Sequence, residues 1–363
     1  MFSRILNAFQ SKHVQLKEIK NAAIITINRP EKMNTFTLEM PKQLYELLKD
    51  LETSDKKHVV IQGAGERAFC AGIDLRELMK NPNDSEAGFY SSNSMDLISQ
   101  YKKPYTAILD GITMGGACFY SMTSKYRIAT ERTVFAMPET EIGFFTNAGA
   151  SFFLPRLKYN LGYYVALAGA RLYGYDIKKF GLASHYIESK RMEDFMKALV
   201  KCKDDYEVGR TIANYSSVPV CTDSELDEIL PRIDKCFDGD SVEEIYDNLG
   251  LDGSEWAMQT IRVLNRMSPM SMKICHRLLN MGSKLSLKEC LKLETLLSYN
   301  IMTHYSQDFK EGVRALIIEK DLKPKWNPKI LHDIKDEDVD KIFASIPVEF
   351  ELKFESDNGK SKL

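Results

Sequence analysis

The chain has 363 residues and a mass of 41.5 kDa, and 44% of the residues are hydrophobic, which is enough to bury the core of one large domain or of one domain with a helical appendage. Its 49 basic and 51 acidic residues nearly cancel to a net charge of -2, which argues against direct nucleic-acid binding. No run approaches the roughly 18 apolar residues that cross a bilayer, so we expect no transmembrane helix.

The cysteines and histidines give no sign of a metal site. The seven cysteines are scattered, contain no C-x-x-C pair and are odd in number, which argues against a zinc site and a disulfide framework. The six histidines show no H-x-x-x-H spacing. We therefore expect no metal and no cofactor, in a reducing compartment.

Residues 1–13 form a separate N-terminal segment. The first twelve residues carry basic and hydroxyl side chains and no acid, and Phe2, Ile5, Leu6 and Phe9 follow helical spacing. This pattern is typical of a mitochondrial targeting helix. The alternative is an ordinary N-terminal arm whose apolar stripe docks on the body.

The next hundred residues predict alternating strands and helices. Residues 14–28 alternate in polarity and then become continuously apolar, which predicts a hairpin around Lys20 and Asn21. The following expected elements, in chain order, are a helix capped by Thr37, a strand over 58–62, a glycine loop over 63–74, a helix from Leu75 and a mobile polar loop over 81–94. This order is typical of right-handed βαβ units.

The centre of the chain predicts an anion site. Residues 105–109 are continuously apolar and predict a buried strand, and the turn Gly115-Gly116-Ala117 follows it. Glycine lets backbone N–H groups face a ligand without obstruction by a Cβ atom. We expect a helix from Cys118 to Lys125, which would put Gly116 at a helix N-terminus, where unpaired N–H groups favour an oxyanion.

From Leu161 the chain is predicted to be mainly helical, and strand patterns almost vanish after residue 190. Helical periodicity recurs with Ser or Asp near most starts, over residues 162–172, 176–180, 242–249, 254–267, 271–281 and 287–303. We therefore divide the chain into an N-terminal arm, a β/α core, a helical C-terminal region and a polar tail that we expect to be disordered, at residues 1–13, 14–195, 196–353 and 354–363.

Four motifs resemble the crotonase, or enoyl-CoA hydratase/isomerase, superfamily in order and spacing. They are Asn-Arg-Pro-Glu-Lys-Met-Asn at 28–34, Ala-Phe-Cys-Ala-Gly-Ile-Asp at 68–74, Gly-Ile-Thr-Met-Gly-Gly at 111–116 and Phe-Ala-Met-Pro-Glu-Thr-Glu-Ile-Gly at 135–143. The resemblance implies an α/β fold with a spiral β/α core and a helical C-terminal region. Within the superfamily the chain is similar to the 3-hydroxyisobutyryl-CoA hydrolases of valine catabolism, because the similarity continues past where hydratases usually end, through residues 267–273 and 308–326.

The resemblance implies a site for an acyl-CoA thioester, with CoA present only as part of the substrate. The thioester oxygen would lie between two backbone N–H groups, at positions matched here by Ala71 and Gly116. Glu139 matches the carboxylate that the hydrolases use as nucleophile or general base.

Several positions depart from the family pattern. Asn147 stands where the hydrolases have an Asp, and a further expected acid corresponds to Ser91 or Ser92. The first catalytic Glu of the hydratases maps to Phe119, which excludes their paired-carboxylate hydration mechanism. The family's glycine runs are interrupted here at Ala117 and at Gly149-Ala-Ser151, and we expect the added side chains to narrow the acyl pocket.

These observations leave two hypotheses. In the first, the chain is an impaired acyl-CoA thioester hydrolase of the mitochondrial matrix, in which Glu139 acts, Ala71 and Gly116 bind the oxyanion, Asn147 orients the acyl hydroxyl and Ser92 lies at the substrate. In the second, it is a catalytically inactive relative that serves as a structural subunit of a larger mitochondrial complex, since expected acids are replaced.

Overall fold

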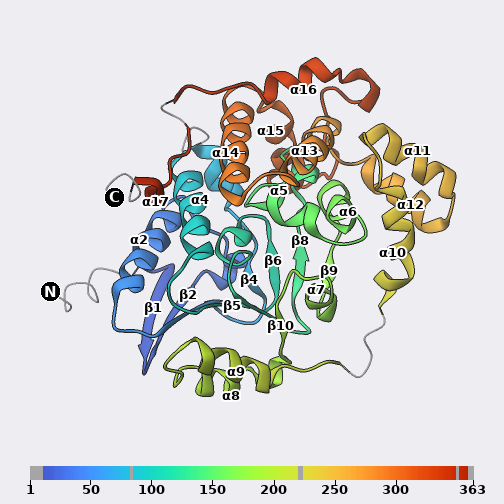
Figure 1. Ribbon diagram of the computed structural model, residues 1–363. Coiled ribbons are helices and arrows are strands. Elements are labelled where there is room, and N and C mark those ends of the chain that lie inside the picture. The colour runs from blue at the N-terminus through green and yellow to red at the C-terminus, as the bar shows by residue number, and fades with distance from the viewer. Residues whose placement is uncertain (1–10, 82–84, 220–223, 349–350, 359–363) are drawn as a thin grey trace.

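The computed structural model describes residues 11–81, 85–219, 224–348 and 351–358 and contains two sheets (Figure 1). The six-stranded sheet has the order β1 (Val14–Ile19), β2 (Ala22–Ile27), β3 (His58–Gly63), β5 (Tyr105–Leu109), β7 (Tyr126–Ala129), β10 (His185–Tyr186). The four-stranded sheet has the order β4 (Ala68–Cys70), β6 (Ile112–Met114), β8 (Val134–Ala136), β9 (Leu172–Tyr173).

The chain alternates between the two sheets in a spiral. β3, β5 and β7 are parallel in the first sheet, and β4, β6 and β8, each the next strand in the chain, are parallel in the second. β1 and β2 form the predicted antiparallel hairpin, with Lys17 opposite Ile24, and β2 pairs in parallel with β3. The predicted α/β fold with a spiral β/α core is therefore confirmed.

A close backbone approach makes the crossing between the sheets possible at Gly111. This residue lies between β5 and β6 with φ +83°, and a Cβ atom there would lie 2.5 Å from the Arg67 carbonyl oxygen. Only glycine accepts both the positive φ and the contact. The turn sets where β6, and the loop after it, lie against β4.

Helices surround the sheets on several sides (Figure 1). The α-helices are α2 (Met40–Thr53), α3 (Leu75–Lys80), α4 (Glu86–Ser99), α5 (Ala150–Phe153), α6 (Leu161–Ala168), α7 (Tyr175–Lys179), α8 (Met192–Leu199), α9 (Asp205–Tyr215), α10 (Glu225–Cys236), α11 (Val242–Asp252), α12 (Glu255–Leu264), α13 (Pro269–Gly282), α14 (Leu287–His304), α15 (Gln307–Val313), α16 (Asp336–Ile342) and α17 (Glu355–Asn358). The shorter 3-10 and π turns are η1 (Pro30–Lys32), η2 (Gly115–Tyr120), η3 (Glu139–Ile142), η4 (Leu154–Arg156), η5 (Ser189–Arg191), η6 (Arg314–Ile318) and η7 (Leu331–Asp333).

Two hydrophobic cores lie against the six-stranded sheet. The smaller one joins Phe195 and Leu199 of α8 and Val208 and Ile212 of α9 to strand residues such as Val60. The larger one continues from the strands through α2, α4 and α6 to α11, α13 and α14. Because one buried cluster spans both parts of the chain, the C-terminal helices are packed onto the core; the exact border near residue 195 stays a prediction.

Three segments before residue 100 differ from the sequence prediction. Residues from Glu86 belong to helix α4, where we expected a mobile loop. The sequence hides this helix because its buried side carries small polar residues next to the apolar ones, namely Ser91, Ser92, Asn93 and Ser94 beside Met95 and Ile98. The helix predicted from Thr37 begins at Met40 with Glu39 as its N-cap. In addition, the predicted glycine loop contains the short strand β4.

The helix predicted over Cys118 to Lys125 is also wrong. Gly115–Tyr120 form the 3-10 helix η2, and β7 begins at Tyr126, which leaves too few residues for an α-helix between them. Gly116 is the second residue of this short turn. The macrodipole of a long helix therefore does not act at Gly116, and any oxyanion there is held by individual N–H groups.

The C-terminal region agrees with its predicted periodicity. Helices α11, α12, α13 and α14 lie where four of the patterns predicted them, and no strand follows β10 within the described residues. The predicted disordered tail differs: Phe354 is buried, and α17 follows it with Glu355 paired to Lys49. Of the N-terminal segment, residues 1–10 lie outside the described residues, so the targeting prediction is not tested.

The described residues contain no helix long and apolar enough to cross a membrane. Six of their cysteines are free and buried, and none of their His, Cys, Asp and Glu side chains gather in threes as metal ligands would. The prediction of no disulfide framework agrees with the six free thiols.

His58 makes the fold sensitive to acid. It opens β3, is fully buried, and neither ring nitrogen makes a hydrogen bond of normal geometry. Burial lowers the pKa of the His58 imidazole to about 4, and the Leu199 carbonyl opposes this shift only partly. The imidazole is thus neutral in the folded state and takes up a proton on unfolding at mildly acidic pH.

We predict that stability falls as the pH drops from 6.5 towards 4, by at most about 3 kcal/mol from this group. His58→Met should flatten this part of the profile of unfolding free energy, measured by urea denaturation. His332→Gln, which changes an exposed histidine, is the matched control and should leave the profile intact. An unchanged acid slope in His58→Met would contradict the prediction.

Candidate active site

Two glycine-containing segments of the candidate site, around Gly72 and around Gly116, lie side by side. A Cβ atom on Gly116, in η2, would lie 3.6 Å from the Ile73 nitrogen, and one on Gly72 would lie 3.4 Å from the Gly116 nitrogen. Gly72 has φ +92° and Gly115 has φ +53°, conformations that glycine adopts readily. Within the described residues, neither Ile73 nor Gly116 uses its N–H in a hydrogen bond. These two adjacent N–H groups can act as donors to one oxygen.

The N–H of Ala71 is not available in the same way. It donates to the Met33 carbonyl oxygen at 3.0 Å. Residues Met33 and Asn34 have positive φ values of 52° and 55°, and the Asn34 side-chain amide donates to the Ala68 carbonyl oxygen at 2.7 Å, so this turn is held against β4. The structure thus corrects the expected donor pair: Ile73, two residues further along, takes the place expected for Ala71.

Backbone pairing explains this two-residue correction. The Phe36 N–H donates to the Gly72 carbonyl oxygen at 2.8 Å, and the Asp74 N–H donates to the Phe36 carbonyl oxygen at 2.8 Å. In a parallel pairing of this kind, the residue between the two bonded ones turns its own N–H away from the partner strand. Ile73 is that residue. The Phe36 ring contacts Tyr120 of η2, with centroids 4.9 Å apart, which keeps the two loops together.

Glu139 lies next to the Gly115-Gly116 turn. It is the first residue of η3, just after β8, and a Cβ atom on Gly115 would lie 3.0 Å from its Oε1. The residue is 7% exposed, and Oε2 has no hydrogen-bond partner among the residues that the structure describes. An unpaired carboxylate oxygen is costly to bury, so this atom is the group in the site most in need of a ligand or a proton.

The electrostatics of Glu139 favour its neutral form. Burial raises the pKa of the Glu139 carboxyl to about 8; its own backbone N–H acts in the opposite direction, and the Glu294 carboxylate raises the pKa further. At neutral pH most of the carboxyl is therefore protonated. A step that needs the carboxylate is slowed by this protonation until the pH approaches 8.

Asn147 lies in a loop that is held from the C-terminal region. The Asn147 residue is half-buried, and its main-chain carbonyl oxygen accepts a hydrogen bond of 3.1 Å from the Ala150 N–H. Glu294 of α14 accepts from the Gly149 N–H at 2.8 Å, from the Ser151 N–H at 3.0 Å and from the Ser151 hydroxyl at 2.6 Å. The sequence prediction missed Glu294. The sequence does contain a signal for it: Glu294 falls on the same helical face as the apolar residues Leu287, Leu291 and Leu297 of α14, which indicates a buried acid.

The other expected site positions lie around η2. Ser91 and Ser92 are buried in α4, and the Ser91 hydroxyl lies 3.5 Å from the Tyr120 hydroxyl. Phe119 is half-buried and packs on the main core. Ala117 is fully buried, so its methyl group fills space where the family pattern has glycine. No contact places Ser92 next to Glu139, and its role stays a prediction.

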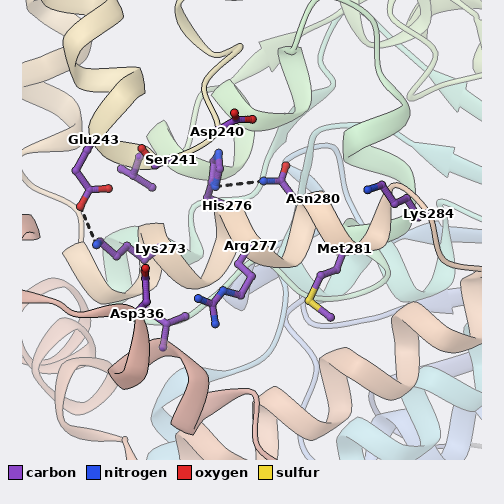
Figure 2. A pocket seen from close by; sticks show the side chains of 12 residues that line it. Asp240, Ser241, Glu243, Lys273, His276, Arg277, Asn280, Met281, Lys284 and Asp336 are labelled. Carbon is purple, nitrogen blue, oxygen red and sulfur yellow. Dashed lines mark hydrogen bonds and ion pairs between the residues drawn. The ribbon is translucent and has the colours of Figure 1, made fainter.

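A separate cavity of about 380 Å³ lies between α11, α13 and α16 (Figure 2). Its polar groups largely satisfy one another: Lys273 pairs with Glu243 at 2.7 Å, and the His276 Nε2 lies 2.8 Å from the Gly239 carbonyl oxygen. A second cavity of about 590 Å³ is lined by α5, η4 and the end of α7, with Arg156 at its wall. Neither cavity is lined by Glu139, Gly116 or Ile73.

Comparisons with known proteins show which family and fold this chain resembles. A family model described as Enoyl-CoA hydratase/isomerase matches residues 22–343. The mitochondrial 3-hydroxyisobutyryl-CoA hydrolase of Danio rerio is 39% identical over 353 residues, which cover 94% of this chain and 92% of that protein. The mitochondrial enzyme of the same name in Homo sapiens is 38% identical, with 93% and 89% covered.

Solved structures share the fold. A carnitinyl-CoA dehydratase from Mycobacterium thermoresistibile superposes with a TM-score of 0.87 and 30% identity, covering 95% of this chain and 99% of that one. An enoyl-CoA hydratase from Rhodobacter sphaeroides gives a TM-score of 0.83 with 27% identity, covering 94% and 100%.

The raised pKa of Glu139 also predicts an effect on stability. Its folded-state pKa of about 8 lies above the ordinary value of 4.5, so the folded state holds a proton that the unfolded state releases between these pH values. The stability contributed by this group is present below pH 4.5 and is lost as the pH rises through 8. The total loss in free energy of unfolding is at most about 4–5 kcal/mol. Glu139→Gln should therefore gain stability relative to the native protein between pH 5 and 9, by chemical denaturation. A constant difference between the two proteins over that range would refute the assignment.

Proposed function

This chain belongs to the enoyl-CoA hydratase/isomerase family, and we propose that it acts as a slow acyl-CoA thioester hydrolase of the 3-hydroxyisobutyryl-CoA type. The observation that carries the proposal is the buried Glu139 carboxyl, with one oxygen unpaired, next to the free N–H groups of Ile73 and Gly116. The relatives named as 3-hydroxyisobutyryl-CoA hydrolases support the substrate class.

The two N–H groups would hold the thioester oxygen. Attack on the carbonyl carbon turns this oxygen into an oxyanion, and donors fixed in advance stabilise it more than they stabilise the ground state. Ile73 and Gly116 suit this role because the fold leaves both N–H groups unpaired and adjacent. Loss of one such donor typically costs about 10²–10³ in rate.

Glu139 would supply the reacting carboxylate. It either attacks the carbonyl carbon, so that the thiolate of CoA leaves and an acyl-enzyme anhydride is then hydrolysed, or it takes a proton from the attacking water. Both routes need the ionised form, which burial disfavours near neutral pH. Asn147 can hydrogen-bond the hydroxyl group of the acyl chain but cannot carry a charge or take a proton. The raised pKa of Glu139 and the uncharged side chain of Asn147 together support a slow rate of hydrolysis.

The location and the partners follow from the same proposal. The two relatives described above are named mitochondrial, and we place this chain in the mitochondrial matrix with an acyl-CoA thioester as its ligand. The groups named for the reaction belong to the chain itself, so the proposal includes no metal or separate cofactor. The alternative of an inactive subunit in a larger mitochondrial complex draws on the replaced acids at Asn147 and at Ser91 or Ser92.

We predict hydrolysis of 3-hydroxyisobutyryl-CoA that is slow at pH 7 and rises about tenfold towards pH 9 as Glu139 ionises, with a midpoint near 8. Release of free CoA thiol measures this rate. Glu139→Gln should abolish the reaction, whereas Glu141→Gln, which changes a half-buried acid in the same turn η3, is the matched control.

We also predict that Asn147→Asp accelerates hydrolysis, roughly 10²-fold if the second acid acts in proton transfer. Rapid turnover by the native protein at pH 7 that Glu139→Gln abolishes would contradict the impairment but keep the hydrolase. No turnover in the native protein or in Asn147→Asp, with no binding of the thioester by calorimetry, would favour the structural alternative.

A further inference from the structure

We propose that Glu294 of α14 is a positioning residue of this site: its carboxylate fixes the loop from Asn147 to Ser151 and directs a negative charge towards Glu139. The consequence for reaction rate rests on the proposed function. The charge coupling between Glu294 and Glu139 does not rest on it.

The contacts of Glu294 form a complete set for an ionised carboxylate. Oε2 accepts from the Gly149 N–H at 2.8 Å, and Oε1 accepts from the N–H and the hydroxyl of Ser151 at 3.0 and 2.6 Å. The residue is 3% exposed. Three donors on two oxygens stabilise the anion, and both backbone donors come from the short segment that follows Asn147. The loop therefore has its position set by α14.

A second helix closes the same segment from the other side. A Cβ atom on Gly282, at the end of α13, would lie 2.1 Å from the Ser151 carbonyl oxygen, so the helix backbone and the loop are in direct contact. Gly149 has φ +75°, and a Cβ atom there would lie 2.4 Å from the Met95 Cε. The loop is thus enclosed by α13, α14 and α4, and Glu294 supplies its charged hydrogen bonds. Such support gives Glu294 influence over the position of Asn147.

The charge of Glu294 contributes to the raised pKa of the Glu139 carboxyl. Burial raises the pKa of Glu294 to about 7, while the hydrogen bonds from Ser151 and Gly149 act in the opposite direction. Among the described residues, three buried thiols interact with one or both of these acids: Cys118 on η2, Cys290 on α14 and Cys275 on α13. Burial raises the pKa of each thiol, so these groups stay neutral. Above about pH 7, ionised Glu294 therefore acts on the Glu139 carboxyl and helps to keep it protonated.

A double-mutant cycle tests the coupling without requiring any activity. The free energy of unfolding is measured from pH 5 to 9 for the native protein, Glu139→Gln, Glu294→Gln and the double variant. The difference made by Glu139→Gln at each pH reports the titration midpoint of Glu139, with and without the charge at position 294. We expect Glu294→Gln to lower this midpoint by about 0.5–1 pH unit.

Two further variants separate charge from packing. Glu294→Asp keeps the charge and should leave the midpoint closer to the native value than Glu294→Gln does. Glu289→Ala removes the capping box at the exposed start of the same helix, so it should reduce stability without moving the midpoint. If Glu294→Gln does not fold, Ser151→Ala removes one donor to Glu294 and should move the midpoint in the same direction by a smaller amount.

The effect on rate gives the second readout. Where hydrolysis is measurable, Glu294→Gln should lower kcat about tenfold above pH 9, because the loop with Asn147 loses its fixed position. It should also shift the midpoint of the pH–rate profile to lower pH, because the charge at position 294 is removed. Glu294→Asp should restore part of the profile. An unchanged midpoint in the cycle, with only a uniform loss of stability, would overturn the proposal and leave Glu294 as a packing residue. A shifted midpoint in a protein without turnover would keep the coupling and refute the proposed function alone.

Discussion

The backbone pairing of Phe36 with Gly72 and Asp74 is the interaction on which the site depends. Its two hydrogen bonds, each 2.8 Å long, fix the loop after β4 and turn the intervening Ile73 N–H away from the partner segment. The Phe36 ring then packs on Tyr120 and so holds this loop to η2. One short pairing thus selects a donor and sets its distance from Gly116, before any catalytic side chain is considered.

The site contains two buried acids, Glu294 and Glu139, whose carboxyl groups receive different numbers of hydrogen bonds. Glu294 receives three hydrogen bonds that favour its ionised form against burial, whereas the Glu139 Oε2 receives none from the described residues. A buried carboxyl without donors keeps its proton, because the neutral form is far cheaper to remove from water. Conditions that ionise Glu139 for chemistry therefore oppose folding stability. Such a conflict between stability and activity is common where an ionisable group is held for reaction.

The C-terminal helices contribute to the site as well as to the core. α13 and α14 contact the loop after Asn147 through Gly282 and Glu294, and the main hydrophobic cluster continues into both helices. A β/α core without these helices would leave Gly149 and Ser151 without their acceptor. This dependence gives a physical reason why the chain extends beyond the spiral core.

The sequence by itself determined the features that depend on local pattern. Apolar runs located β1, β2, β3 and β5, helical periodicity located α11 to α14, and the glycines marked both loops of the site. It could not reveal α4, whose buried side is rich in small polar residues, or choose Ile73 over Ala71. Nor could it join Glu294 to the Asn147 loop. Those outcomes were decided only in the tertiary structure, because the direction of a backbone N–H and the partner of a buried carboxylate depend on which distant segments pack together.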